Sequence, residues 1–152
     1  MNSGSSSQAK SRNVFDVLAL ALAWLASPKL GLHGQPLGPA DLYQRPIITN
    51  PGPSHLYSTI YDWFAGAGLV PQRLNTCTSL TIVAKLTADG IGTAILPPVL
   101  VRRELSLGQL VRLVTAPDLP VHYISVAYHA WTERGELAPI ANLAHKLVTR
   151  AR

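Results

Sequence analysis

Residues 46–68 read PIITNPGPSHLYSTIYDWFAGAG, and this stretch predicts one strand–turn–helix unit. Pro46 to Thr49 is a short apolar strand, and Asn50 to Pro53 is rich in residues that form turns. Ser54 is a good N-cap residue for the helix that follows. The apolar side chains of that helix recur at helical spacing; they are Leu56, Ile60, Trp63 and Phe64. We expect the helix to end at Gly66.

The same pattern repeats twice further along the chain. A strand is predicted at Arg73–Thr76, and a helix capped by Thr78 or Ser79 follows it. A buried strand within Ile91–Leu96 then leads into a short helix within Pro97–Leu105. Alternating strands and helices predict right-handed crossovers and a mainly parallel sheet covered by helices, which is the α/β fold class.

The predicted carboxyl edge of this sheet is rich in polar side chains. Ligands of open α/β sheets bind at that edge, and the helix N-termini there favour an anion. The hydroxyl and amide side chains expected at the edge are Thr49, Asn50, Ser54, Thr76, Thr78 and Ser79. A small carboxylate suits such a set. Helix capping alone also accounts for Ser54 and Ser79, so binding and capping remain two open interpretations.

The composition indicates a folded protein of modest size. The chain has 152 residues, 47% hydrophobic and 14% charged, so one domain or two small lobes fit and a mainly disordered chain is disfavoured. The net charge is +5, but only Arg102 and Arg103 are adjacent, so we expect no nucleic-acid contact by this chain itself. Cys77 is the only cysteine, which excludes an internal disulfide, and no zinc-ligand spacing is present.

No catalytic signature is found in the sequence. Gly90-Ile-Gly92 begins like a dinucleotide-binding fingerprint, but Ile95 stands where the third glycine belongs. A phosphate-binding loop, a nucleophile elbow and a zinc-protease motif are also missing. The sequence therefore predicts a binding protein that is not an enzyme, without a cofactor and without a metal site.

The N-terminal region allows two interpretations. Val17–Ala26 is a run of ten apolar residues, which is too short to span a bilayer. Lys10 and Arg12 precede the run and give it the look of a secretory signal peptide. The run is otherwise typical of a buried strand or helix, between which periodicity does not decide. Residues 1–13 are predicted to be a flexible leader.

The C-terminal region predicts one strand and one helix. Val121–Ala130 alternates like a strand, and Ala138–Arg150 has the pattern of an amphipathic helix. If Val121–Ala130 and Val17–Ala26 belong to a sheet whose other strands are absent, their edges are open to association. We therefore expect the chain to form a dimer or larger assembly.

From about Leu22 onward, the chain resembles the effector-binding region of LysR-type transcriptional regulators. The motifs that carry the resemblance are Ala-Trp-Leu-Ala-Ser-Pro at 23–28, Asp41-Leu42 before Pro46-Ile-Ile, Pro53-Ser-His-Leu56, Trp63-Phe64 with Ala67-Gly68, Asn75-Thr-Cys-Thr-Ser-Leu80, Thr87-Ala-Asp-Gly-Ile-Gly92 before Leu96-Pro97, and Glu104-Leu105 with Gly108-Gln-Leu-Val111. Each motif is short, and their order and spacing together make the resemblance specific.

The resemblance implies a type 2 periplasmic-binding-protein-like fold, with one complete Rossmann-like lobe and part of a second lobe. Residues 46–120 would be the complete second lobe. Residues 14–45 would be a remnant of the first lobe and the crossing between lobes, and residues 121–152 would return to the first lobe. The helix-turn-helix that precedes this region in the family would be missing, so the chain would be an N-terminally truncated regulator.

The resemblance also implies a function. The chain would be a cytoplasmic effector-binding domain that regulates transcription in the intact protein, forms a homo-oligomer, and reaches DNA only through the missing helix-turn-helix. The effector would contact the six polar residues named above, and Arg45 would be a further candidate to pair with its carboxylate. The alternative is an exported type 2 solute-binding protein, which the apolar run after Lys10 and Arg12 suggests.

Overall fold

The computed structural model describes residues 12–129, 139–140, 143 and 146, and it divides into two compact units. Unit 1 contains the described residues up to Leu20 and from His122 onward, and unit 2 is Ala21–Val121. Most of the predicted leader and most of the predicted C-terminal helix lie outside the described residues. Within the described part of the chain, no helix is long and apolar enough to cross a membrane.

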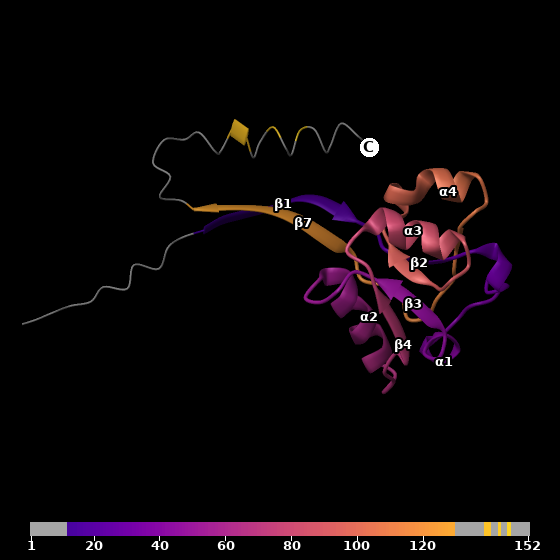
Figure 1. Ribbon diagram of the computed structural model, residues 1–152. Coiled ribbons are helices and arrows are strands. Elements are labelled where there is room, and N and C mark those ends of the chain that lie inside the picture. Colours follow the sequence, from indigo (N-terminus) through magenta and orange to yellow (C-terminus); the bar gives the residue numbers. More distant parts are fainter. Residues whose placement is uncertain (1–11, 130–138, 141–142, 144–145, 147–152) are drawn as a thin grey trace, which may run out of the picture. The chain divides into compact units, whose positions relative to one another are not determined.

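Unit 1 is built on an antiparallel ribbon of two strands, β1 (Arg12–Leu20) and β7 (His122–His129) (Figure 1). Their register runs from Arg12 opposite His129 to Leu20 opposite His122, with one irregularity near Asp16. The strand predicted near Val121–Ala130 is therefore confirmed. Arg12 and Asn13 belong to β1, so the predicted flexible leader is wrong for these two residues.

Unit 2 is a mixed sheet with the strand order β4-β3-β5-β2-β6. Its strands are β2 (Ala23–Ala26), β3 (Pro46–Thr49), β4 (Arg73–Thr76), β5 (Ala94–Leu96) and β6 (Val111–Arg112). β3 and β4 are parallel, a parallel bridge between Ile47 and Thr93 joins β3 to the segment of β5, and β2 is antiparallel to both β5 and β6. β3, β4, β5 and β6 therefore run in one direction, as predicted for a mainly parallel sheet, and β2 runs in the opposite direction between β5 and β6. Strand–helix alternation predicts the direction of strands joined by a helix crossover, and β2 precedes those crossovers.

The apolar run Val17–Ala26 forms parts of two strands. β1 ends at Leu20 in unit 1, and β2 begins at Ala23 in unit 2, so Ala21 and Leu22 interrupt the run. Unit 2 therefore begins well before Pro46, where the sequence placed the start of the complete lobe, because β2 is the strand between β5 and β6 in its sheet.

Helices cover both faces of the unit 2 sheet. The short helical segments are η1 (Pro28–Leu30), α1 (Pro39–Leu42), η2 (Pro98–Val101) and α4 (Arg102–Ser106), and the longer helices are α2 (His55–Ala65) and α3 (Leu80–Ala88). The predicted caps are confirmed, because Ser54 Oγ accepts a hydrogen bond from Tyr57 N at 3.2 Å and Ser79 Oγ accepts one from Ile82 N at 3.4 Å.

The core is split by the sheet into two clusters. Trp24 packs with α2 on one face, where its ring centroid lies 5.1 Å from that of Trp63 and 6.1 Å from that of Phe64. Leu25, the next residue of β2, packs on the other face with Val83 of α3. Neighbouring strand residues point to opposite faces, so β2 contributes to both clusters. The helices that follow β4 and β5 thus lie on the face opposite α2 (Figure 1).

Candidate functional site

The carboxyl ends of β3 and β4 bring most of the predicted binding residues together. Thr49 lies opposite Thr76 in the parallel register. Beyond the strands, Cys77 N donates to Thr49 O at 2.8 Å and Asn50 Nδ2 donates to Thr78 O at 3.2 Å. We use the term rim for the set formed by Thr49, Asn50, Ser54, Thr76, Thr78 and Ser79.

Two polar atoms of the rim are buried and have no hydrogen-bond partner among the described residues. They are Thr49 Oγ1 and Asn50 Oδ1. Thr49 is 1% exposed, although its side chain is polar. Buried polar atoms are hydrogen-bonded in the large majority of cases, and each exception calls for an explanation. At Thr49 and Asn50, a bound polar molecule would supply the missing partners.

Two helix N-termini contribute the electrostatics of the rim. α2 has 11 residues and α3 has 9, so both carry a positive partial charge at the ends that Ser54 and Ser79 cap. Each capping hydroxyl accepts a backbone hydrogen bond, which leaves its own hydrogen available as a donor. The structure therefore confirms the capping role and leaves both hydroxyls able to donate to a ligand.

Thr76 and Thr78 lie at the surface of the rim, and Arg45 lies away from it. Thr76 and Thr78 are exposed, so they can contact a ligand only at the outer part of the rim. Arg45 precedes Pro46, at the amino end of β3, and its Nε donates to Asp41 O at 3.1 Å. Four residues of extended strand span about 13 Å, which separates Arg45 from Thr49. The structure does not bring Arg45 to the rim.

A tyrosine pair next to the rim was not predicted as part of the site. Tyr57 packs its ring against Gly52, where an added Cβ would lie 3.2 Å from the ring carbon Cδ1. The hydroxyl groups of Tyr57 and Tyr61 share a hydrogen bond of 3.3 Å, and this hydrogen bond, with a smaller effect of burial, raises the pKa of Tyr61. The only sequence signal was a glycine in the turn followed by an aromatic residue in the first helical turn. The pair shapes the turn that carries Asn50.

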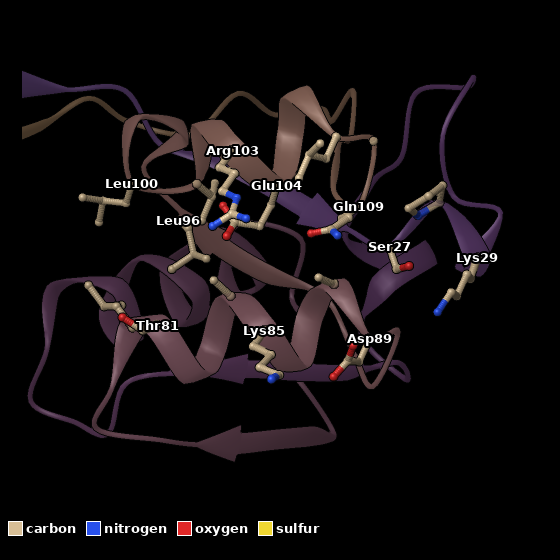
Figure 2. A pocket seen from close by; sticks show the side chains of 17 residues that line it. Ser27, Lys29, Thr81, Lys85, Asp89, Leu96, Leu100, Arg103, Glu104 and Gln109 are labelled. Carbon is tan, nitrogen blue, oxygen red and sulfur yellow. The ribbon is translucent and has the colours of Figure 1, made fainter.

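The structure also contains a cavity that the sequence did not reveal. It has a volume of about 880 Å³ and lies between α3 and the η2–α4 segment (Figure 2). Its lining residues are Ser27, Pro28, Lys29, Leu80, Thr81, Ala84, Lys85, Ala88, Asp89, Leu96, Leu100, Val101, Arg103, Glu104, Leu107, Gly108 and Gln109. None of the rim residues lines it, so this cavity and the rim are different places on unit 2.

No metal site is found among the residues that the structure describes, since they contain no group of three or more His, Cys, Asp or Glu residues able to hold an ion. Cys77 is a half-buried free thiol beside the rim. The described chemistry of the rim is therefore hydrogen bonding and helix-dipole electrostatics.

Comparison with known sequences gives a family match over most of the chain. Residues 12–140 match a family model described as the LysR substrate binding domain. A segment of 76 residues is 34% identical to the HTH-type transcriptional activator AmpR of Citrobacter koseri. This segment covers 49% of the chain and 25% of that protein, so the match spans about a quarter of this relative's length.

Solved structures of regulatory domains share the fold. The regulatory domain of the LysR family regulator MetR from N. meningitidis has a TM-score of 0.75 at 17% identity, over 95% of this chain and 67% of that chain. The Synechocystis PCC6803 CcmR regulatory domain in complex with 2-PG has a TM-score of 0.77 at 16% identity, over 93% and 69% respectively. Such domains have the type 2 periplasmic-binding-protein-like α/β fold, which confirms the predicted fold class.

Proposed function

The chain belongs to the LysR substrate binding domain family, and from this membership we propose that its rim binds a small effector that carries a carboxylate. The observation that carries the proposal is the pair of buried polar atoms without partners, Thr49 Oγ1 and Asn50 Oδ1. An effector whose carboxylate accepts a hydrogen bond from Thr49 Oγ1, and whose own O–H or N–H group donates to Asn50 Oδ1, would remove the free-energy cost of leaving these two atoms unpaired.

The charge of the effector follows from the helix ends. Hydroxyl and amide groups can act as donors, and the N-termini of α2 and α3 contribute positive partial charge without a formal cation. The rim residues include no carboxylate that would repel an anion. A carboxylate gains from both features, whereas a neutral amide of the same shape gains only from the donors. This difference supports an anionic effector.

The proposed role is binding without catalysis. In the intact protein, effector binding would shift a conformational equilibrium between lobes and so alter the geometry of a homo-oligomer. Unit 2 would be the complete lobe of this arrangement, and β1 and β7 would belong to the other lobe. DNA contact would come from a helix-turn-helix outside this sequence, and the protein would act in the cytoplasm as a regulator of transcription.

The alternative of an exported solute-binding protein loses its supporting observation. The apolar run that suggested a signal peptide contributes to β1 and β2, which pair with β7 and with β5 and β6 respectively. These residues are therefore part of the described fold. The LysR regulatory role remains the function that we propose.

Isothermal titration calorimetry with a panel of small carboxylates and their matched primary amides tests the proposal. We expect at least one carboxylate to bind and its amide to bind at least tenfold more weakly. Thr49→Val and Ser79→Ala should each lower the affinity for that carboxylate by about tenfold, which corresponds to about 1.4 kcal/mol of binding free energy. Ser106→Ala, on the exposed surface of α4, is the matched control.

Two results would contradict the proposal. One is a panel in which no carboxylate binds. The other is a carboxylate that binds Thr49→Val and Ser79→Ala as tightly as it binds the unaltered chain.

A further inference from the structure

The cavity between α3 and α4 has the dimensions of a small-molecule site. Its volume of about 880 Å³ lies within the range of about 300–1,000 Å³ that is usual for such sites. Ala84, Leu96 and Val101 line it and are buried, so its floor is apolar. Charged side chains surround this floor on α3, on α4 and on the η1 segment (Figure 2).

Ser27 supplies a buried polar group that no described residue of the chain satisfies. The residue lines the cavity, is 1% exposed, and its Oγ atom has no hydrogen-bond partner. It follows β2 on the same face of the sheet as Leu25, which packs against α3. A hydroxyl in this position can donate one hydrogen bond and accept others. A ligand in the cavity would be its natural partner.

Side chains of both charge signs lie at the Ser27 end of the cavity. Figure 2 shows Lys29, Asp89 and Gln109 at this end, with Arg103 further along the opposite wall. Gly90, which follows Asp89, lies close to Ser27, because a Cβ at Gly90 would be 3.8 Å from Ser27 Cβ. Within the described part of the chain, the ionic groups of Lys29 and Asp89 are not engaged in an ion pair. Both charges are therefore available to a ligand.

From this arrangement we propose that the cavity is a second ligand site, separate from the rim, and that it binds an α-amino acid with a large apolar side chain. The carboxylate of the amino acid accepts a hydrogen bond from Ser27 Oγ and pairs with Lys29. Its ammonium group pairs with Asp89 at the C-terminal end of α3, where the helix dipole favours a cation. Its side chain lies on the apolar floor formed by Ala84 and Leu96.

The charge pattern selects a zwitterion over a simple acid or amine. A ligand with only a carboxylate would gain from Lys29 and Ser27 but would be repelled by Asp89. A ligand with only an ammonium group would gain from Asp89 and be repelled by Lys29. Lys85, Arg103 and Glu104 line the same cavity further from Ser27 (Figure 2), so they act on the charged end of the ligand over a longer distance and their interactions are screened.

The test compares three probes of one shape on the full chain by calorimetry: L-phenylalanine, 3-phenylpropanoate and 2-phenylethylamine. We expect L-phenylalanine to bind and each of the other two probes to bind at least tenfold more weakly. We expect the affinity for L-phenylalanine to fall at least tenfold in each of three variants, which are Ser27→Ala, Lys29→Gln and Asp89→Asn. Arg102→Gln and Asp62→Asn are the matched controls, because they remove exposed charges outside the cavity and should not change binding.

The results of this test distinguish binding in the cavity from binding at the rim. If L-phenylalanine does not bind, or if 3-phenylpropanoate binds as tightly, the proposal is overturned. It is also overturned if Thr49→Val abolishes L-phenylalanine binding while Ser27→Ala and Lys29→Gln do not, because the ligand then lies at the rim. Lys29 is exposed, so Lys29→Gln remains informative even if Ser27→Ala impairs folding. A rim that binds no carboxylate does not affect this test.

Discussion

Thr49 and Thr87 are both buried threonines, but their hydroxyl groups are in different situations. Thr87 is fully buried and its Oγ1 donates to Val83 O at 2.7 Å. Thr49 is 1% exposed and its Oγ1 has no partner. The first hydroxyl stabilises the fold through a hydrogen bond, whereas the second was desolvated on folding without compensation. This contrast agrees with the proposed role of the Thr49 hydroxyl in binding a ligand.

Replacing each threonine by valine tests this interpretation. Thr49→Val should leave the free energy of unfolding unchanged or raise it by up to about 1 kcal/mol, because an unpaired buried hydroxyl is removed. Thr87→Val should lower it by about 1 kcal/mol, because a hydrogen bond is lost. Urea denaturation followed by circular dichroism measures both changes. A larger loss of stability in Thr49→Val than in Thr87→Val would contradict the interpretation.

For single residues, the sequence predicts those roles that depend only on neighbouring residues in the chain. Ser54 and Ser79 were recognisable as caps because an N-cap and the helix that it begins are adjacent in sequence. The burial of Thr49 and Ser27 was not recognisable, because it depends on strands and helices that are distant in sequence. Arg45 was named for its charge, and the strand that follows it places that charge at the wrong edge of the sheet.

Among the elements, β3 and the segment that leads into β5 approach each other closely at their junction. Thr93 N donates to Pro46 O at 2.9 Å, and Ile48 N donates to Thr93 O at 2.8 Å. A Cβ at Gly92 would lie 2.6 Å from Pro46 O, which is too close for any side chain. Because β3 carries the rim at its other end, this junction also fixes where the rim lies.

Gly92→Ala should therefore separate β3 from β5. We expect the free energy of unfolding to fall by about 1–3 kcal/mol, as for other overpacked sites. Gly66→Ala is the control, because Gly66 has φ −58° and the nearest atom to its Cβ position is 3.6 Å away. That change should be neutral or slightly stabilising. Equal effects of the two substitutions in urea denaturation would show that the junction tolerates a side chain.

The N-terminus of α2 gives a second prediction at the scale of elements. Ser54→Ala removes the acceptor of the Tyr57 N hydrogen bond and should lower the free energy of unfolding by about 1 kcal/mol. Ser58→Ala, on the exposed side of the same helix, should change it by less than about 0.5 kcal/mol, because alanine is the better helix former. Thermal or urea unfolding measures both. A loss in Ser58→Ala as large as that in Ser54→Ala would refute the capping role.

The position of β2 was the main feature of the elements that the sequence did not predict. Its apolar residues indicated a buried segment, but they carried no information on which strands would flank it. The pairing of Trp24 with Ile95 joins residues that are far apart in the chain. The cavity between α3 and α4 was missed for the same reason, since Ser27, Asp89 and Gln109 line one cavity only in the folded unit.

At the scale of the whole molecule, the described part of unit 1 is mainly a ribbon of two strands. Within the described residues, β1 and β7 pair only with each other. Tyr123 and Ile124 of β7 are 56% and 43% exposed. An isolated ribbon of two strands is marginally stable in water, and each of its strands has an unpaired edge. The ribbon is therefore the part of the described chain most open to pairing with another molecule.

The chain should associate through this ribbon. We expect sedimentation velocity at micromolar concentration to show a dimer or larger species, as the sequence predicted. Ile124→Lys places a charge on the ribbon and should shift the distribution toward the monomer. Val114→Lys changes a valine of unit 2 that is 62% exposed and should leave the distribution as it is. A monomer for the unaltered chain across this concentration range would contradict the prediction.

The register of the ribbon has one more consequence, for the design of altered chains. Leu20 lies opposite His122, and unit 2 is the chain between them. Opposed Cα atoms in antiparallel strands are about 4.5–5.5 Å apart, so the ends of unit 2 enter and leave side by side. Unit 2 is in this sense an insertion into a hairpin. A short linker could therefore join the two ends of unit 2, and new termini could be placed in an exposed loop to give a circular permutant. For the same reason, unit 2 could be inserted into a loop of another protein.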